Sequence, residues 1–194
     1  MVAPRTIHFT TVLHILHYFK GTLGHGLQFS SQSSLVLYDY SNTDWARDHI
    51  DRHSTIGYCF YQGDPLISWR SKKQSVVSRF STESEYHALA NAIAELLWLH
   101  WLLADMGVPQ QGLTLLHWDN RSAIQITYND VFHEHTKHIE NDINFVHHHL
   151  LRNTLFLRSV STTEQLADIF TKALPSNRIS QLFTKLKLTA TLPS

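Results

Sequence analysis

The chain of 194 residues lacks several features that would place it in particular classes of protein. It has one cysteine, Cys59, which excludes an internal disulfide framework and a multi-cysteine zinc site and fits a reducing compartment. No run approaches the ~20 apolar residues that a membrane span needs. Residues 1–20 also lack the charged head and apolar block of a secretory signal. We therefore expect an intracellular protein without a membrane partner.

An excess of one charge is also lacking. The 16 Lys and Arg residues balance 16 Asp and Glu residues, so no protein-wide field attracts nucleic acid or anionic lipid, and any basic surface must be local. The composition is 43% hydrophobic, 11% aromatic and only 16% charged, which predicts a packed core and excludes a disordered chain. The length suits about one domain of ~100 to 200 residues.

The hydrophobic pattern predicts strands alternating with helices. A first amphipathic helix follows Pro4, with Phe9, Leu13 and Leu16 at helical spacing, and a Ser-rich linker follows at 30–34. Five later segments are dense in apolar, β-prone residues and are predicted strands: Leu35–Ser41, Ile56–Gln62, Leu66–Trp69, Leu113–Trp118 and Thr154–Val160. Five others have helical period and are predicted helices: Thr82–Trp101, Ala123–Ile126, Ile139–Leu151, Leu166–Ala173 and Ile179–Leu186.

Polar side chains stand where strands end and helices begin, which is where a sheet flanked by helices usually carries function. Asn42 and Asp44 follow the first strand, Glu85 opens the long helix, Asp119 ends the fourth strand, and Asp168 lies early in the penultimate helix. Converging carboxylates would supply oxygen ligands for Mg²⁺. A pair of such ions ~3.5–4 Å apart can activate water and stabilise the leaving oxygen in phosphodiester cleavage.

Each carboxylate also has a purely structural explanation. Glu85 lies three residues after Thr82, which is capping-box spacing, and a second such pair, Ser161 with Glu164, precedes the penultimate helix. Asp119 suits a turn and a helix cap, and Asp168 suits a solvated position near a helix start. Spacing alone leaves both interpretations open.

A basic segment surrounds the third strand and the loop after it. Arg70, Lys72, Lys73 and Arg79 form a patch that could follow the phosphates of a nucleic acid whose sequence is not read. A solvated charged loop would look the same in the sequence.

The 15 histidines include His133, His135, His138 and the run 147–149, so a zinc site has to be considered. A specific zinc pattern would add cysteines or a helical His-Glu-x-x-His motif, and the sequence has neither. We interpret the run 147–149 as an exposed helix face. Cys59 lies in an apolar strand pattern, which is typical of a buried structural thiol and not of a nucleophile.

Several segments together carry a family pattern. They are residues 40–46 (YSNTDWA), 52–59 (RHSTIGYC), 66–74 (LISWRSKKQ), 78–90 (SRFSTESEYHALA), 118–124 (WDNRSAI), 136–140 (TKHIE) and 164–172 (EQLADIFTK). In this order and spacing the chain, over about residues 35–188, resembles the ribonuclease H domain of copia-type long-terminal-repeat retrotransposon Pol polyproteins. Residues 16–22 (LHYFKGT) resemble the chain that leaves the reverse transcriptase just upstream.

The resemblance implies an α/β, ribonuclease H-like fold with a five-stranded mixed sheet flanked by helices. It implies hydrolysis of the RNA strand of an RNA/DNA hybrid with two Mg²⁺ ions, or with Mn²⁺. Carried over position by position, the family's acidic ligands fall at Asn42, Glu85, Asp119 and Asp168. The first position departs from the family, which has Asp-Ala-Asp-Trp where this chain has Asn-Thr-Asp-Trp. A neutral amide is a weaker ligand, so we expect severe loss of activity unless Asp44, on the same strand face, compensates.

We expect three parts: residues 1–32, a helix and linker left from the reverse transcriptase end; residues 33–175, the ribonuclease H-like domain; and residues 176–194, a C-terminal helix and tail. The domain is either a ribonuclease H-type endonuclease or a non-catalytic remnant or hybrid-binding module with the same fold. The implied partners are the hybrid and an ancestral reverse transcriptase domain, and the implied location is a cytoplasmic particle or the nucleus. If the apolar face of the first helix lacks a partner, it predicts self-association.

Overall fold

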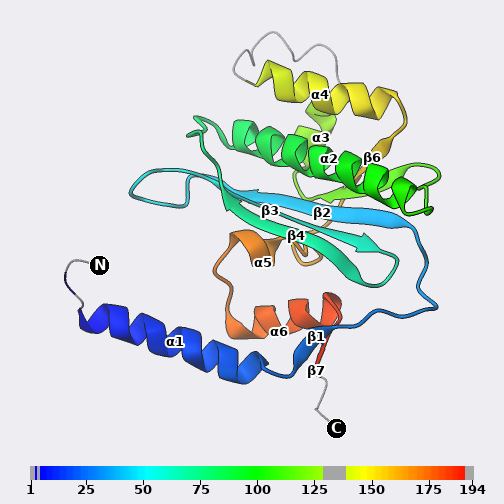
Figure 1. Cartoon of the computed structure of the whole chain (residues 1–194). Coiled ribbons are helices and arrows are strands. Elements are labelled where there is room, and N and C mark those ends of the chain that lie inside the picture. The colour runs from blue at the N-terminus through cyan, green and yellow to red at the C-terminus, as the bar shows by residue number, and fades with distance from the viewer. Residues whose placement is uncertain (1–2, 4, 129–138, 191–194) are drawn as a thin grey trace.

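The computed structural model describes residue 3 and residues 5–128 and 139–190. It contains a five-stranded sheet with helices on both faces and a separate two-stranded sheet (Figure 1). The strands are β1 (His25–Leu27), β2 (Leu37–Asp44), β3 (Thr55–Gln62), β4 (Leu66–Lys73), β5 (Thr114–Trp118), β6 (Leu155–Ser159) and β7 (Leu188–Ala190). The helices are α1 (Thr6–Thr22), α2 (Ser81–Asp105), α3 (Arg121–Thr127), α4 (Glu140–Leu151), α5 (Asp168–Thr171) and α6 (Ser176–Lys185).

The larger sheet is mixed and has the strand order β4-β3-β2-β5-β6. β3 runs antiparallel to β2 and β4, whereas β2, β5 and β6 run parallel to one another. The carboxyl ends of these three parallel strands therefore meet at one edge of the sheet, and polar residues that follow them are brought together. The predicted fold class, an α/β protein with a five-stranded mixed sheet, is confirmed.

Alternate strand residues face two different hydrophobic layers. On one face, Phe60, Leu116 and Trp118 are buried against α2, which contributes Leu89 and Ile93. Tyr61 and Cys59 face the other way and pack in a second cluster with residues of α6. Figure 1 shows α2, α3 and α4 on one side of the sheet and α5 and α6 on the other.

One glycine allows α5 to lie directly against the sheet. Gly57 in β3 is the register partner of Asn42, and a Cβ added to it would lie 2.7 Å from Phe170 Cβ and 2.7 Å from Thr171 Cγ2. The Ser71 hydroxyl of β4 also donates a hydrogen bond of 2.6 Å to the Phe170 carbonyl. α5 is therefore held close to β2 and β3, which brings its first residue, Asp168, to the edge of the sheet.

The segment just after α1 pairs with the last described residues of the chain, which the sequence did not predict. β1 and β7 form an antiparallel ladder from His25 with Ala190 to Leu27 with Leu188. Both segments are only three residues long, so they offer little periodicity of their own. The predicted part boundaries after residues 32 and 175 stay predictions.

The predicted first helix is confirmed as α1, but it contributes no buried residue to the core. In Figure 1 it extends away from the layered part of the molecule. Its apolar side chains Phe9, Leu16 and Phe19 are all more than half exposed, at 64%, 56% and 57%. Over the described ranges, no helix has both the length and the hydropathy to cross a membrane.

Candidate active site

The edge where the parallel strands end gathers the predicted acidic positions. Asn42 lies near the carboxyl end of β2, and Asp119 directly follows β5. Glu85 lies near the start of α2, and Asp168 is the first residue of α5. Asn42 and Asp168 are almost completely buried, at 2% and 3% exposure. Four segments that are far apart in the sequence thus contribute to one site.

Asp168 accepts hydrogen bonds from two residues. The Asn42 amide nitrogen donates to Asp168 Oδ1 over 2.6 Å, and the Lys172 ammonium donates to the same oxygen, also over 2.6 Å. The Asn42 carbonyl oxygen accepts from the Thr43 backbone N–H at 2.7 Å, which fixes the amide with its nitrogen toward Asp168. An aspartate at position 42 would offer a carboxylate in place of this donor.

Glu85 does not close the capping box that its spacing with Thr82 suggests. α2 begins at Ser81, with Phe80 as its N-cap and no side-chain cap hydrogen bond. Glu85 Oε2 instead accepts a hydrogen bond of 2.8 Å from Trp118 Nε1 at the end of β5. Burial, with a smaller contribution from the Asp119 carboxylate, raises the pKa of Glu85 from 4.5 to about 7.

Asp119 is likewise not the cap of the helix that follows it. Asn120 fills that role, because its side-chain oxygen accepts the Ala123 N–H at 2.9 Å. Burial raises the pKa of Asp119, Asp168 adds to the rise, and the Lys172 cation and a hydrogen bond from Gln165 oppose it. Asp119 therefore shares an electrostatic environment with Asp168.

The short helix α5 differs from the predicted helix over 166–173. The hydrogen bond between Ser161 and Glu164 is present at 3.0 Å, but the helix begins only at Asp168. Gln165 holds the intervening segment irregular, because its amide donates to the Ser41 carbonyl at 3.0 Å and its oxygen accepts the Ala167 N–H at 3.2 Å. Asp168 is therefore the first residue of α5 and follows an irregular segment. The longer predicted helix would have placed it inside the helix.

Asp44 is engaged elsewhere. Its carboxylate forms an ion pair of 2.6 Å with Arg47, three residues along the chain. Within the described parts of the chain, no hydrogen bond joins Asp44 to Glu85, Asp119 or Asp168. Arg47 therefore competes for the Asp44 carboxylate, and compensation by Asp44 for the missing aspartate at position 42 stays a prediction.

The donor chemistry of the site fits a hard divalent cation. Glu85, Asp119 and Asp168 supply the carboxylate oxygens that Mg²⁺ and Mn²⁺ prefer, and their mutual repulsion is the kind that such a cation relieves. Among the described residues, no group of three or more His, Cys, Asp or Glu side chains is already arranged around a metal position. A metal ion would have to compete with the Lys172 ammonium for Asp168.

Lys172 and Gln165 are the two site residues that sequence reasoning missed. Lys172 follows Asp168 by four residues, a spacing that places side chains on one helix face, so that signal was available. No local sequence pattern indicated that Gln165 belongs to the site, because its partners Ser41 and Asp119 are far from it in the sequence.

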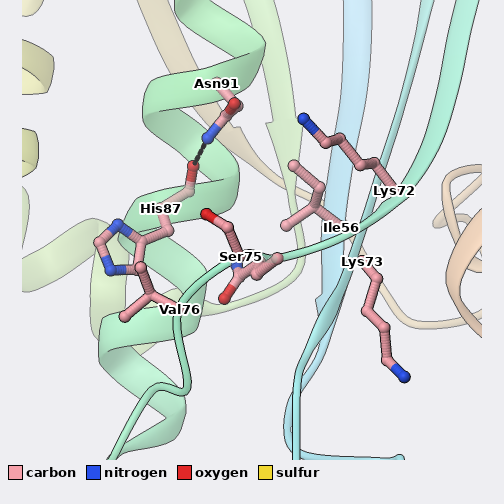
Figure 2. A pocket seen from close by; sticks show the side chains of 8 residues that line it. Ile56, Lys72, Lys73, Ser75, Val76, His87 and Asn91 are labelled. Carbon is pink, nitrogen blue, oxygen red and sulfur yellow. Dashed lines mark hydrogen bonds between the residues drawn. The ribbon is translucent and has the colours of Figure 1, made fainter.

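Two neighbouring cations of the predicted basic patch, Lys72 and Lys73, differ in orientation, and the patch of Arg70, Lys72, Lys73 and Arg79 stays a prediction. Lys73 pairs with Asp48 and Asp51, and Figure 2 shows the Lys72 and Lys73 ammonium groups pointing in opposite directions. Arg70 donates to the Tyr58 hydroxyl at 3.3 Å. A small pocket of about 110 Å³ lies beside Lys72, where it is also lined by residues of α2 (Figure 2).

The remaining candidates from the sequence are histidines considered as zinc ligands and the cysteine Cys59. His133, His135 and His138 lie outside the described residues. In the run 147–149, His148 is exposed and His149 packs against Phe145, so the run is only partly an exposed face. The Cys59 thiol is fully buried, and burial raises its pKa well above the usual range, as expected for a structural cysteine.

The fold and the position of the site define a ribonuclease H-like domain. The structure superimposes on LC11-RNase H1, isolated from compost, with a TM-score of 0.53 at 13% identity, covering 71% of this chain and 93% of that one. The complex of LC11-RNase H1 with an RNA/DNA hybrid gives a TM-score of 0.54 at 12% identity, covering 70% and 93%. No family model matches the chain.

Sequence relatives identify the family to which this ribonuclease H-like domain belongs. The chain is 38% identical over all 194 of its residues to the Pol polyprotein of transposon RE1, and 40% identical over 174 residues, 90% of the chain, to that of transposon RE2, both from Arabidopsis thaliana. The chain belongs to the ribonuclease H domains of copia-type retrotransposon Pol polyproteins. It spans only 13% and 12% of the length of these two relatives.

Proposed function

We propose that this domain is a ribonuclease H-type nuclease that hydrolyses the RNA strand of an RNA/DNA hybrid, and that Asn42 limits its activity. The observation that carries the proposal is the gathering of Glu85, Asp119 and Asp168 at one sheet edge. None of the three has the structural role that would otherwise explain it: Glu85 closes no capping box, Asp119 caps no helix, and Asp168 is buried.

Glu85, Asp119 and Asp168 would hold Mg²⁺, or Mn²⁺, when the site is loaded. Bound ions of this kind activate the attacking water and stabilise the leaving oxygen of a phosphodiester. The chain's own residues keep the carboxylates oriented: Trp118 donates to Glu85 at 2.8 Å, and Gln165 bonds Asp119 while anchored on the Ser41 carbonyl. Lys172 neutralises Asp168 until a cation binds.

Asn42 weakens this design in two ways. It would remove one negative charge from the ligand set, and its amide nitrogen donates to an oxygen of Asp168, a carboxylate that would help hold a metal ion. With Lys172 at the same oxygen, Asp168 is satisfied without any metal. Because Asn42 and Lys172 already satisfy Asp168, this arrangement favours the second candidate function, a non-catalytic domain that retains the fold and binds the hybrid.

The proposal extends to the setting of the domain. Its nucleic-acid partner would be the RNA/DNA hybrid, and its neighbour in the ancestral polyprotein would be a reverse transcriptase domain. An intracellular setting, in a cytoplasmic particle or in the nucleus, belongs to the same proposal.

Cleavage of a labelled RNA/DNA hybrid in Mg²⁺ and in Mn²⁺ tests the function. We expect slow cleavage by the native chain and at least about 100-fold faster cleavage by Asn42→Asp, because a carboxylate at this position restores charge stabilisation. The Asp119→Asn change should abolish cleavage in either background. Asp44→Asn, which removes a carboxylate paired with Arg47, should leave the rate unchanged.

The outcomes separate the two candidate functions. If only the Asn42→Asp chain cuts, the native protein is a disarmed ribonuclease H. If neither chain cuts although both fold cooperatively, the assignment of the site is wrong.

A further inference from the structure

A second pocket lies beside the candidate active site, on the sheet face that α6 partly covers. It has a volume of about 260 Å³, and Tyr40, His117, Arg158, Glu164 and Lys185 are among the residues that line it. A space of this size has room for several water molecules and therefore for a phosphate group. Tyr40 precedes Asn42 by two residues on the same strand face, so the pocket begins ~6–7 Å from the site along β2.

Two of the side chains that line the pocket are aromatic rings in contact with each other. The Tyr40 and His117 rings stack with centroids 4.4 Å apart and planes at 16°. His117 Nδ1 lies 2.8 Å from the Asp39 carbonyl, and because a carbonyl only accepts, this nitrogen carries the proton.

Two other side chains that line the pocket, Arg158 and Lys185, are cationic, although the whole chain has zero net charge. Arg158 and Lys185 face one carboxylate, Glu164, which accepts a hydrogen bond of 3.0 Å from Ser161. The Lys185 ammonium donates to the Thr163 carbonyl at 3.2 Å. In the part of the chain that the structure describes, the Arg158 guanidinium has no hydrogen-bond or ion-pair partner. The pocket therefore holds an excess positive charge and an unused planar donor group.

We propose that this pocket binds a backbone phosphate of the nucleic-acid strand whose next phosphate reaches the carboxylate site. Arg158 and Lys185 hold the phosphate oxygens, and the attached sugar lies against the Tyr40 and His117 rings. The inference rests on the proposed function in taking a nucleic acid as the ligand. It differs from the predicted patch around Arg70, which lies at the opposite edge strand of the sheet.

Binding of a labelled RNA/DNA hybrid in EDTA, followed by fluorescence anisotropy across a salt series, tests the inference without any cleavage. Arg158→Gln should weaken binding about 10-fold and reduce the slope of log K against log salt by about 0.9, the loss of one phosphate contact. Lys185→Gln should act in the same direction. The matched control is Arg152→Gln, which removes the same charge from an exposed position at the end of α4, outside the pocket. It should change binding less than about 2-fold.

Calorimetric titration with inorganic phosphate distinguishes a nucleic-acid contact from a free-anion site. If phosphate binds through Arg158 but hybrid affinity is equal in Arg158→Gln and Arg152→Gln, the pocket holds a free anion and the inference is overturned. Failure of the native chain to bind hybrid overturns it as well. A chain that binds hybrid through Arg158 but never cuts contradicts only the proposed catalytic function, whereas a chain that cuts without needing Arg158 for binding contradicts only this inference.

Discussion

The Asp39 carboxyl group lies at the centre of β2, between its register partners Phe60 and Leu116. It is fully buried, and neither carboxyl oxygen has a hydrogen-bond partner in the described structure. Burial therefore raises the pKa of Asp39 well above its usual 3.8. A buried polar group without a partner costs about 1–3 kcal/mol, so this residue works against the fold that contains it.

Asp39→Val should increase the free energy of unfolding by about 1–3 kcal/mol near neutral pH. In the unmodified chain, the native state binds more protons at Asp39 than the unfolded state does, so its stability falls as the pH rises above 3.8. The stability difference between Asp39→Val and the unmodified chain should therefore grow with rising pH. Urea unfolding of both chains at several pH values measures this. Asp39→Asn, which keeps an unpartnered polar group, is the control. A stability difference that does not change with pH would contradict the pKa argument.

Asn42 has a stability consequence apart from catalysis. In Asn42→Asp, the donor that lies 2.6 Å from Asp168 becomes a second carboxylate, so like charges face each other in a buried site. We expect this variant to be less stable than the native chain in EDTA by about 1–3 kcal/mol, and to regain stability as Mg²⁺ or Mn²⁺ is added. Thermal unfolding over a metal titration measures both effects. Equal metal responses of the two chains would show that position 42 is not at a metal site.

Among the elements, α5 depends on the strand beneath it. It has only four residues, so packing on the sheet, and not helix propensity, keeps it in place. The missing side chain of Gly57 permits that packing, because Phe170 and Thr171 lie within 2.7 Å of where a Cβ would be. The position of Asp168 is thus set by a glycine in β3.

Gly57→Ala should lower the free energy of unfolding by about 1–3 kcal/mol, as overpacking in a tight contact does, and should displace Asp168 from Asn42. Its effect on hybrid cleavage by the Asn42→Asp chain should exceed what the stability loss alone explains. Gly26→Ala in β1 is the matched control, since no atom lies within 4 Å of its added Cβ. Denaturant unfolding and cleavage rates measure the two effects. If cleavage is unchanged, α5 does not position the site through Gly57.

On the scale of the whole molecule, α1 stands apart from the layers that form the core. None of its residues is buried, while β1 next to it is paired with β7. The helix presents several large apolar side chains to solvent, which favours association between copies. The core itself lies between the five-stranded sheet and its flanking helices and does not use α1.

Removal of residues 1–23, which keeps β1, should leave the unfolding transition of the domain unchanged and should reduce self-association. Size-exclusion chromatography of the full and shortened chains over a range of concentrations measures this. Two chains that both elute as monomers would show that the exposed apolar face does not drive association. A large loss of stability on shortening would show that α1 supports the core.

The fold class and the succession of the five core strands along the chain could be predicted from the sequence, and so could the candidate acidic positions, whose role as a site stays a prediction. These follow from local information: the period of apolar residues along each segment, and short motifs at family spacing. The replacement of an aspartate by Asn42 was also evident from the sequence, because Tyr40-Ser41 before it and Asp44-Trp45 after it keep the family motif.

The contacts of these residues could not be read from the sequence. That Asn42 donates to the Asp168 oxygen already held by Lys172, and that Glu85 bonds Trp118 and closes no capping box, depend on which segments meet in space. The pairing of β1 with β7 and the pocket around Arg158 likewise join distant parts of the chain. The period of apolar residues predicts which face of a helix or strand a residue occupies. Which side chain it contacts on that face is set by the packing of the whole domain.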